Sequence, residues 1–309
     1  MANARQGSIH LVRIAGIDLY LHWSWFLVAV YEIQSRKGSY SSVLWNIFEY
    51  LALFLIVLLH EFGHALACRQ VGGTANRIML WPLGGVAYVD PPQRPGATLW
   101  SIAAGPLVNV ALFPILFGAL FACRSMGLAQ TMPDLYWLVR SVLIIDVSLL
   151  AFNILPVYPL DGGQILRSML WFVLGRARSL MVATLLGFVG IAGFAILAVL
   201  QRSVWVAAIC VFMVMNCWGG LRHARDLLRM SKLPRRQGFA CPSCRTAPPR
   251  GDFWQCGLCG GTFDTFQTGA ICPYCSARHD LTTCLDCGQQ YPMGQWTGDP
   301  TASFHHFTQ

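Results

Sequence analysis

The stretch His60–His64, with the sequence His-Glu-Phe-Gly-His, stands at the end of a long apolar run, Leu44–Leu59. Two histidines four residues apart on a helix project from the same face, so both imidazoles can bind one zinc ion. Glu61, beside the first histidine, can act as a general base towards a water molecule at that metal. Ionisable side chains are costly in so apolar a segment and are usually functional there. The stretch therefore predicts a hydrolytic zinc site on a membrane-spanning helix.

The composition of the chain is that of a membrane protein. Of its 309 residues, 55% are hydrophobic and 12% are charged, whereas roughly 25% of the residues of a soluble domain are charged. The formal net charge of +8 does not require a nucleic-acid partner, because membrane proteins concentrate Lys and Arg on their cytoplasmic flanks. The first apolar stretch, from Leu19, is interpreted as a retained span, because no clear cleavage site follows it.

Six membrane spans are predicted from runs that approach the ~20 apolar residues needed to cross a bilayer. They are about Leu19–Ile33, Val43–Ala67, Thr98–Ala122, Leu135–Leu155, Leu180–Leu200 and Val204–Gly219. A short helix, Ile165–Leu174, is expected to lie at the membrane interface. An even number of spans places both termini on one side, and the distribution of Lys and Arg indicates that this side is the cytosol. His60 follows Leu44 by roughly 24 Å of helix, so the zinc site lies towards the cytosolic end of its span.

The segment Asn76–Asp90 is neither long enough nor periodic enough to be a span. Two short extended runs separated by Pro82 and Gly84-Gly85 predict a hairpin or a loop that dips into the membrane. Such backbone is tolerated at membrane depth only against protein or a wet cavity. The segment is expected either to line the site and pair with an extended substrate or to form a surface connector. Near the N-terminus, the alternating residues Ser8–Asp18 predict a short strand or interfacial segment.

A third ligand with an oxygen donor would complete a zinc site that keeps one position open for water. Asp161 is the candidate, because it follows two prolines that break the helix of the fourth span. From spacing alone, a turn aspartate before glycines is an equally good interpretation. Asp146 lies deeper in the same span and is expected to hydrogen-bond near the site as a structural partner.

Three motifs in this order resemble the site-2 protease family of intramembrane zinc metalloproteases. They are the His-Glu-Phe-Gly-His stretch, Gly105-Pro106-x-x-Asn109, and Asn153-x-x-Pro156-x-x-Pro159-Leu160-Asp161-Gly162. The resemblance covers about residues 8–225 and implies that Asp161 is the third zinc ligand. It also implies that Asn153 helps to position or stabilise the reacting carbonyl. The substrate implied is a single-span membrane protein, cut within or beside the bilayer to release a cytosolic fragment.

The twelve cysteines fall into two groups. Four lie in or beside apolar spans and are predicted to be small buried hydrophobes, namely Cys68, Cys123, Cys210 and Cys217. The other eight form four Cys-x-x-Cys pairs, Cys241/Cys244, Cys256/Cys259, Cys272/Cys275 and Cys284/Cys287. That spacing is typical of two four-cysteine zinc sites in zinc ribbons, paired either sequentially or in a nested order. Thiolate ligands suit a reducing compartment, which places this region in the cytosol.

The predicted fold is an all-α polytopic membrane protein with about six transmembrane helices, one short membrane-associated hairpin or loop, and a small zinc-ribbon domain. Four parts are expected: a transmembrane zinc metalloprotease domain at 1–221, a basic juxtamembrane linker at 222–238, a double zinc ribbon at 239–292 and a flexible tail at 293–309. The linker is interpreted as an anchor for anionic lipid headgroups rather than a nucleic-acid binding segment. The expected cofactors are one catalytic and two structural zinc ions.

The function predicted from these patterns is that of an intramembrane zinc metalloendopeptidase. Glu61 would take a proton from the water that attacks a substrate amide whose carbonyl the metal polarises. A catalytically silent membrane scaffold that binds clients is an alternative, but it gains nothing from an intact His-Glu-x-x-His motif with Asp161. A membrane-tethered nucleic-acid binder is a second alternative, and the ribbons lack the dense basic face that it needs. The expected partners are therefore a membrane-protein substrate and membrane lipid.

Overall fold

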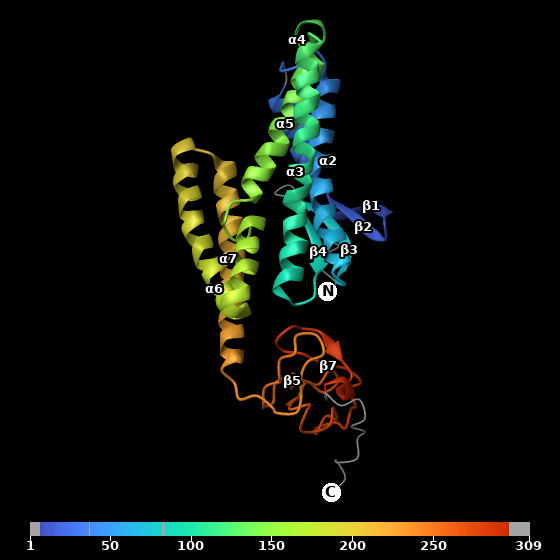
Figure 1. Ribbon diagram of the computed structural model, residues 1–309, viewed down its shortest axis with the longest axis vertical. Coiled ribbons are helices and arrows are strands. Elements are labelled where there is room, and N and C mark those ends of the chain that lie inside the picture. The colour runs from blue at the N-terminus through green and yellow to red at the C-terminus, as the bar shows by residue number, and fades with distance from the viewer. Residues whose placement is uncertain (1–6, 37, 82–83, 297–309) are drawn as a thin grey trace. The chain divides into compact units, whose positions relative to one another are not determined.

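The computed structural model describes residues 7–36, 38–81 and 84–296, which form two compact units, and the chain passes from the first to the second between Leu221 and Arg222 (Figure 1). The first unit consists of helices and one four-stranded sheet, and the second contains the eight paired cysteines. This division agrees with the composition, because the apolar runs all precede the division and the Cys-x-x-Cys pairs all follow it.

Five helices among the described residues are long and apolar enough to cross a membrane. They are α2 (Val43–Gln70), α3 (Pro95–Ser125), α5 (Pro133–Asn153), α6 (Asp161–Gln201) and α7 (Val204–Ser231), with the short α4 (Leu128–Thr131) between α3 and α5. α3 is central to the first unit, because it packs against α2, α5 and α6. Figure 1 shows α2, α3 and α5 side by side. The predicted polytopic helical fold is confirmed.

The first predicted span, Leu19–Ile33, is not a single helix. Its beginning belongs to strand β2 (Ile17–His22), and α1 (Trp25–Ser35) has only 11 residues. A helix of that length rises about 16 Å, which is too short for a hydrocarbon core of roughly 30 Å. The apolar composition was interpreted correctly, but the alternation in Ile17–His22 is a strand pattern, and Ile17 and Leu19 are buried on one face.

β2 and Ser42 nevertheless lie at opposite ends of α2. β2 pairs with a strand that follows α2, and the Arg69 side chain near the end of α2 donates to the carbonyls of Ala15 and Gly16. Ser42 caps the opposite end of α2. The N-terminal sheet therefore lies at the same end of the unit as the carboxyl end of α2, as the predicted arrangement of spans requires.

Strands β1 (Ser8–Ile14), β2, β3 (Thr74–Trp81) and β4 (Gly84–Asp90) form one sheet in the order β1-β2-β3-β4. β2 and β3 are parallel, and the other pairs are antiparallel. The predicted hairpin is thus confirmed as β3 and β4, although its turn at Pro82 lies outside the described residues. The inner face of the sheet packs on α2, where Ile78 and Leu80 contact Val57 and Ala65 in a buried cluster.

α6 contains a break that divides it into the two predicted pieces. Gly175 has φ of 77° and ψ of 168°, a conformation that side chains other than glycine rarely adopt. The helix therefore stops after residue 174 and restarts at 176, close to the predicted boundary between Ile165–Leu174 and the following span. α6 begins at Asp161, so this candidate ligand lies at a helix N-terminus.

The second unit contains two short hairpins, β5 (Trp254–Gln255) with β6 (Thr262–Phe263) and β7 (Thr282–Thr283) with β8 (Gln290–Tyr291). The 3-10 helix η2 (Met293–Gln295) follows, and the fully buried Trp296 packs on Phe266. The folded part of this unit therefore extends to Trp296 and includes the start of the predicted tail. Residues 297–309 of that tail lie outside the described residues.

The predicted basic linker 222–238 is largely structured. Its first part continues α7 to Ser231. Arg235 binds Asp286 through two nitrogens at 2.5 and 3.0 Å, and Arg236 binds the buried Asp264. The sequence interpretation expected the basic residues of this linker to bind lipid headgroups. Arg235 and Arg236 instead form ion pairs within the second unit and are not available for that role.

Candidate metal centre

The candidate centre is built on one buried face of α2. His60, Glu61 and His64 are each less than 9% exposed, although they lie in an apolar helix. The two imidazoles lie one helical turn apart, with their Nε2 atoms 3.1 Å from each other. Asp161, from the start of α6, places its Oδ2 atom 3.0 Å from Nε2 of His60 and 3.4 Å from Nε2 of His64. Three potential ligand atoms from distant parts of the chain therefore converge.

The hydrogen bonds on the far side of each imidazole show which ring nitrogen carries the proton. Nδ1 of His64 lies 2.9 Å from the carbonyl oxygen of Ser101, which can only accept. Nδ1 of His60 lies 2.7 Å from Oδ1 of Asn109, whose amide nitrogen donates to Asp146 at 2.7 Å. Both Nδ1 atoms are therefore donors in the neutral imidazoles, which leaves a lone pair on each Nε2.

This donor set fits a metal ion. Two lone-pair nitrogens and a carboxylate oxygen cannot donate hydrogen bonds to one another, so a cation bound between them would satisfy all three at these distances. Two histidines and one carboxylate are the ligands of a hydrolytic zinc site with an open fourth position. The acceptors behind the two Nδ1 atoms are the outer partners that orient such ligands.

Two glycines allow neighbouring backbone to approach the centre. A Cβ atom at Gly105 of α3 would overlap the His64 imidazole and lie 2.9 Å from Nε2 of His60. A Cβ atom at Gly85 of β4 would overlap the Glu61 side chain. Close contact of α3 and β4 with the site thus requires glycine at both positions.

Glu61 lies beside the ligands and is held by the sheet. Its Oε2 atom accepts a hydrogen bond of 2.8 Å from the backbone N–H of Ala87 in β4. β4 is an edge strand, since β3 is its only partner in the sheet formed by the described residues. The hairpin therefore lines the candidate site, as one of the two expectations held, and its pairing with an extended substrate stays a prediction.

Four further polar residues lie in α3 and α5, and two of them were predicted from the sequence to act at or near the site. Asn153 is the last residue of α5 and is partly buried, and among the described residues no hydrogen bond or ion pair joins it to the three ligands. Asp146 is fully buried and accepts a hydrogen bond from Asn109 near the site, as the sequence suggested. Ser101 and Asn109 were not predicted as partners of the histidines. The only signal for Asn109 was its place in the Gly105-Pro106-x-x-Asn109 motif.

The eight paired cysteines form two separate clusters in the second unit. Cys241 and Cys244 meet Cys284 and Cys287, with Sγ–Sγ distances of 3.7 Å between the two pairs. Sulfurs at the corners of a tetrahedron with Zn–S bonds of about 2.3 Å lie roughly 3.8 Å apart, so the spacing fits zinc and not a disulfide.

The second cluster joins the two inner pairs, Cys256/Cys259 and Cys272/Cys275, at 3.6 Å. The structure therefore favours the nested order that the sequence left open. The four remaining cysteines are all buried, as predicted.

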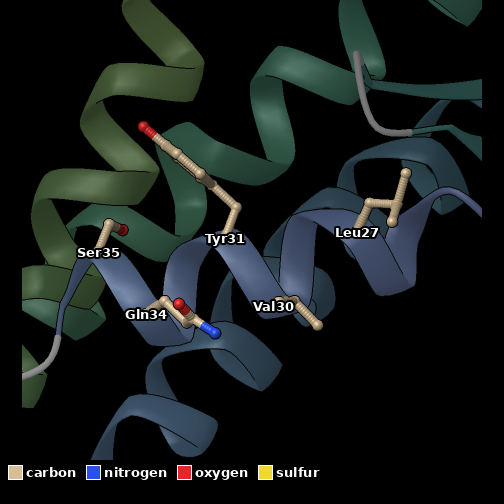
Figure 2. Close-up of a pocket in the computed structure, with 5 residues that line it drawn as sticks. All are labelled: Leu27, Val30, Tyr31, Gln34 and Ser35. Atoms are coloured by element: carbon tan, nitrogen blue, oxygen red, sulfur yellow. The ribbon is translucent and has the colours of Figure 1, made fainter.

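A hollow on α1 is a separate surface feature. Figure 2 shows the residues that line it, which are Leu27, Val30, Tyr31, Gln34 and Ser35. Among the residues that the structure describes, none of those lining it is a histidine, cysteine or acidic residue, and Leu27, Val30 and Tyr31 are more than half exposed. On a membrane protein, such apolar surface suits contact with lipid, so this hollow is not a candidate for the chemistry.

The chain matches one protein-family model and several curated zinc metalloproteases. The model of peptidase family M50 matches residues 48–136 and 128–198, which include the α2 motif and Asp161. A zinc metalloprotease of Methanocaldococcus jannaschii is 31% identical over 184 residues, covering 58% of this chain and 50% of the relative. Stage IV sporulation protein FB of Bacillus subtilis is 32% identical over 189 residues, covering 58% of this chain and 62% of the relative. The chain thus spans 50% to 62% of the length of these relatives.

Among solved structures, the site-2 protease from Methanocaldococcus jannaschii is similar to this chain. The match has a TM-score of 0.49 and 27% sequence identity, and it covers 69% of this chain and 95% of that chain.

Proposed function

We propose, from the premise that this chain belongs to peptidase family M50, that it is a zinc metalloendopeptidase that cuts a membrane protein within or beside the bilayer. The observation that carries the proposal is the convergence of three lone-pair donors, from His60, His64 and Asp161, with a carboxylate beside them. Three protein ligands and a neighbouring base are what metal-assisted hydrolysis of a peptide bond needs.

The residues have distinct roles in this proposal. A zinc ion bound to the three ligands would polarise the substrate carbonyl and increase the acidity of the attacking water. Glu61 takes the proton from that water and transfers it to the departing amine nitrogen. The hydrogen bond from Ala87 keeps the Glu61 carboxylate in position for both transfers. Asn153, as the family resemblance implies, would orient the reacting carbonyl at the end of α5.

β4 offers a way to present the substrate. The Ala87 N–H points away from β3, because it donates to Glu61. Residues of a strand alternate, so the backbone groups of Gly85 and Val89 face the same free edge. An extended substrate segment that pairs with these groups would place a peptide bond beside Glu61. Because helices hide their peptide bonds, a substrate span would have to unwind locally before it could pair.

The proposed substrate is a single-span membrane protein, and the proposed product is a cytosolic fragment. The support is the position of the site near the carboxyl end of α2, where Arg69 and Arg77 follow. Positive residues favour the cytosolic side, so the site, the N-terminal sheet and the second unit would all be cytosolic. The donor sets would hold three zinc ions per chain, one at the His-His-Asp centre and one in each cysteine cluster.

The test compares membrane proteomes of cells that express the wild-type chain or Glu61→Gln as their only copy. The expected result is a single-span protein that accumulates uncut with Glu61→Gln and whose cytosolic fragment is present only with the wild type. Sequencing the new terminus of that fragment would locate the cut. A cut outside any span and its flanks, or no difference between the proteomes when both chains are expressed equally, would contradict the proposal.

A further inference from the structure

We infer that Asn109 and Asp146 are positioning residues that hold His60 in the orientation and tautomer needed to bind the metal. The inference rests on the proposed function, because it concerns the same centre. It starts from a difference between the two histidines. His64 is held by a backbone carbonyl, that of Ser101, whereas His60 is held by a side chain, that of Asn109.

An amide side chain is an ambiguous partner for an imidazole. If its oxygen faces Nδ1 of His60, the ring keeps its proton on Nδ1 and presents a lone pair at Nε2. If the amide turned over, its NH2 group would face Nδ1, and the proton of the neutral ring would move to Nε2. A proton on Nε2 blocks metal binding at that atom, so the orientation of Asn109 decides whether His60 is a ligand.

Asp146 removes the ambiguity. Its carboxylate can only accept hydrogen bonds, and its Oδ1 atom lies 2.7 Å from the amide nitrogen of Asn109. The amide oxygen of Asn109 must then point the other way, towards His60 at 2.7 Å. The three side chains come from α5, α3 and α2 and form one chain of hydrogen bonds that ends at the metal centre.

The burial of these groups supports a functional purpose. Asn109 and Asp146 are both completely inaccessible to solvent. The second oxygen of Asp146 has no hydrogen-bond partner among the described residues. A buried acid in an apolar span is costly, and a stable helix bundle does not need one. Outer partners of this type commonly contribute a factor of 10 to 100 in metal affinity.

The first experiment measures zinc bound to the full chain, purified in detergent and equilibrated in buffers of graded free zinc. His60→Ala sets the baseline for loss of the catalytic site, with the cysteine clusters as an internal reference. Asn109→Leu and Asp146→Leu should each need about 10 to 100 times more free zinc to fill that site. Thr98→Val, which removes another buried polar group from α3, should bind zinc as the wild type does.

The second experiment exchanges the two residues. In the double variant Asn109→Asp with Asp146→Asn, the new carboxylate accepts from both His60 and the new amide, so the same imidazole tautomer is retained. Its zinc affinity should recover towards the wild type, whereas Asn109→Asp alone places two carboxylates together and should bind zinc less tightly than the double variant. A purely structural role predicts no such recovery, because asparagine and aspartate have the same size and shape.

The outcomes separate two failures. If His60→Ala keeps as much zinc as the wild type, the proposed metal centre is wrong. If His60→Ala loses zinc but Asn109→Leu and Asp146→Leu do not, the centre stands and the positioning role is wrong. Failure of the double variant to bind zinc better than Asn109→Leu, with both chains equally folded by thermal unfolding, would also overturn the positioning role.

Discussion

His60 and Asp161 are separated by 101 positions in the sequence, whereas the four residues of the inner cysteine cluster all lie between Cys256 and Cys275. The first centre takes its donors from two helices and its outer partners from two more, α3 and α5. The second takes its donors from two short turns of the same small unit. We therefore expect the helical fold to form its candidate metal site, and the fold of the second unit to depend on metal bound at its cysteine clusters.

Physical chemistry explains the difference. The helical unit has long helices and buried clusters such as the one around Ile78, whose apolar contacts involve no candidate metal ligand. The second unit has only four strands of two residues each and a small aromatic core. So small a core contributes little free energy, and folding in such units depends on the metal.

The largest effect is expected from removal of all zinc from the full chain with a strong chelator. Structural zinc in small domains contributes about 10 to 16 kcal/mol to folding, so residues 239–296 should unfold and be digested by protease. The helical unit should keep its helix content and its protease resistance. Limited proteolysis with mass spectrometry measures both. Protection of the second unit in zinc-free protein would show that its fold does not depend on metal.

The next effect concerns chemistry alone. Glu61→Gln removes the proposed base but no ligand, so cleavage should fall by about 10² to 10⁴ while the zinc content stays unchanged. The measurement is the initial rate on a single-span peptide in detergent, together with elemental analysis. Glu49→Gln is the matched control, since Glu49 is equally buried on α2 but binds Arg36 instead. Near-normal turnover by Glu61→Gln would contradict the mechanism.

Features of the fold and the site could be predicted from the sequence where the contacting residues are close together in the chain. The His-Glu-x-x-His motif acts within one helical turn, so its spacing predicted the geometry of His60 and His64. Asp161 needed the family resemblance, because spacing alone does not relate α6 to α2. The parallel pairing of β2 with β3 was not predicted, since strands on either side of a span leave no local signal.

Two further details depended on contacts between distant residues. The link from Asp146 through Asn109 to His60 joins three helices, and each residue alone looks like an ordinary buried polar group. The nested pairing of the cysteines was also open, because each Cys-x-x-Cys pair has the same spacing. In contrast, the difference between the Leu19–Ile33 prediction and the structure arose from local composition, which is equally apolar in a strand and in a helix.

A change in zinc content smaller than that caused by the chelator, confined to one of the three proposed sites, is expected for Asp161→Ala. Loss of this ligand should lower the zinc content from about three ions to about two per chain and abolish cleavage, while the second unit remains folded. Elemental analysis and limited proteolysis test both parts. Asp134→Ala removes a carboxylate from the same unit, where it contacts Ser41, and should retain all the zinc. If Asp161→Ala keeps wild-type zinc and activity, the third ligand is another residue.

The smallest effect on the chemistry is expected from removal of the second unit, because all the proposed catalytic residues lie in the first. A chain that ends at Ser231 keeps α7 whole and should cut a generic single-span peptide in detergent at a rate similar to that of the full chain. Cleavage of the native client should fall, because a cytosolic unit that binds the client raises its effective concentration at the site.

This comparison between substrates separates recognition from bracing of the helices. A recognition role predicts a loss for the native client that is restored when the client is fused directly to the shortened protease, since fusion replaces the lost effective concentration. A bracing role predicts equal loss for both substrates and a lower unfolding temperature of the helical unit. Equal loss without restoration by fusion would therefore show that the second unit supports the fold of its neighbour, and the independence of the two regions would be wrong.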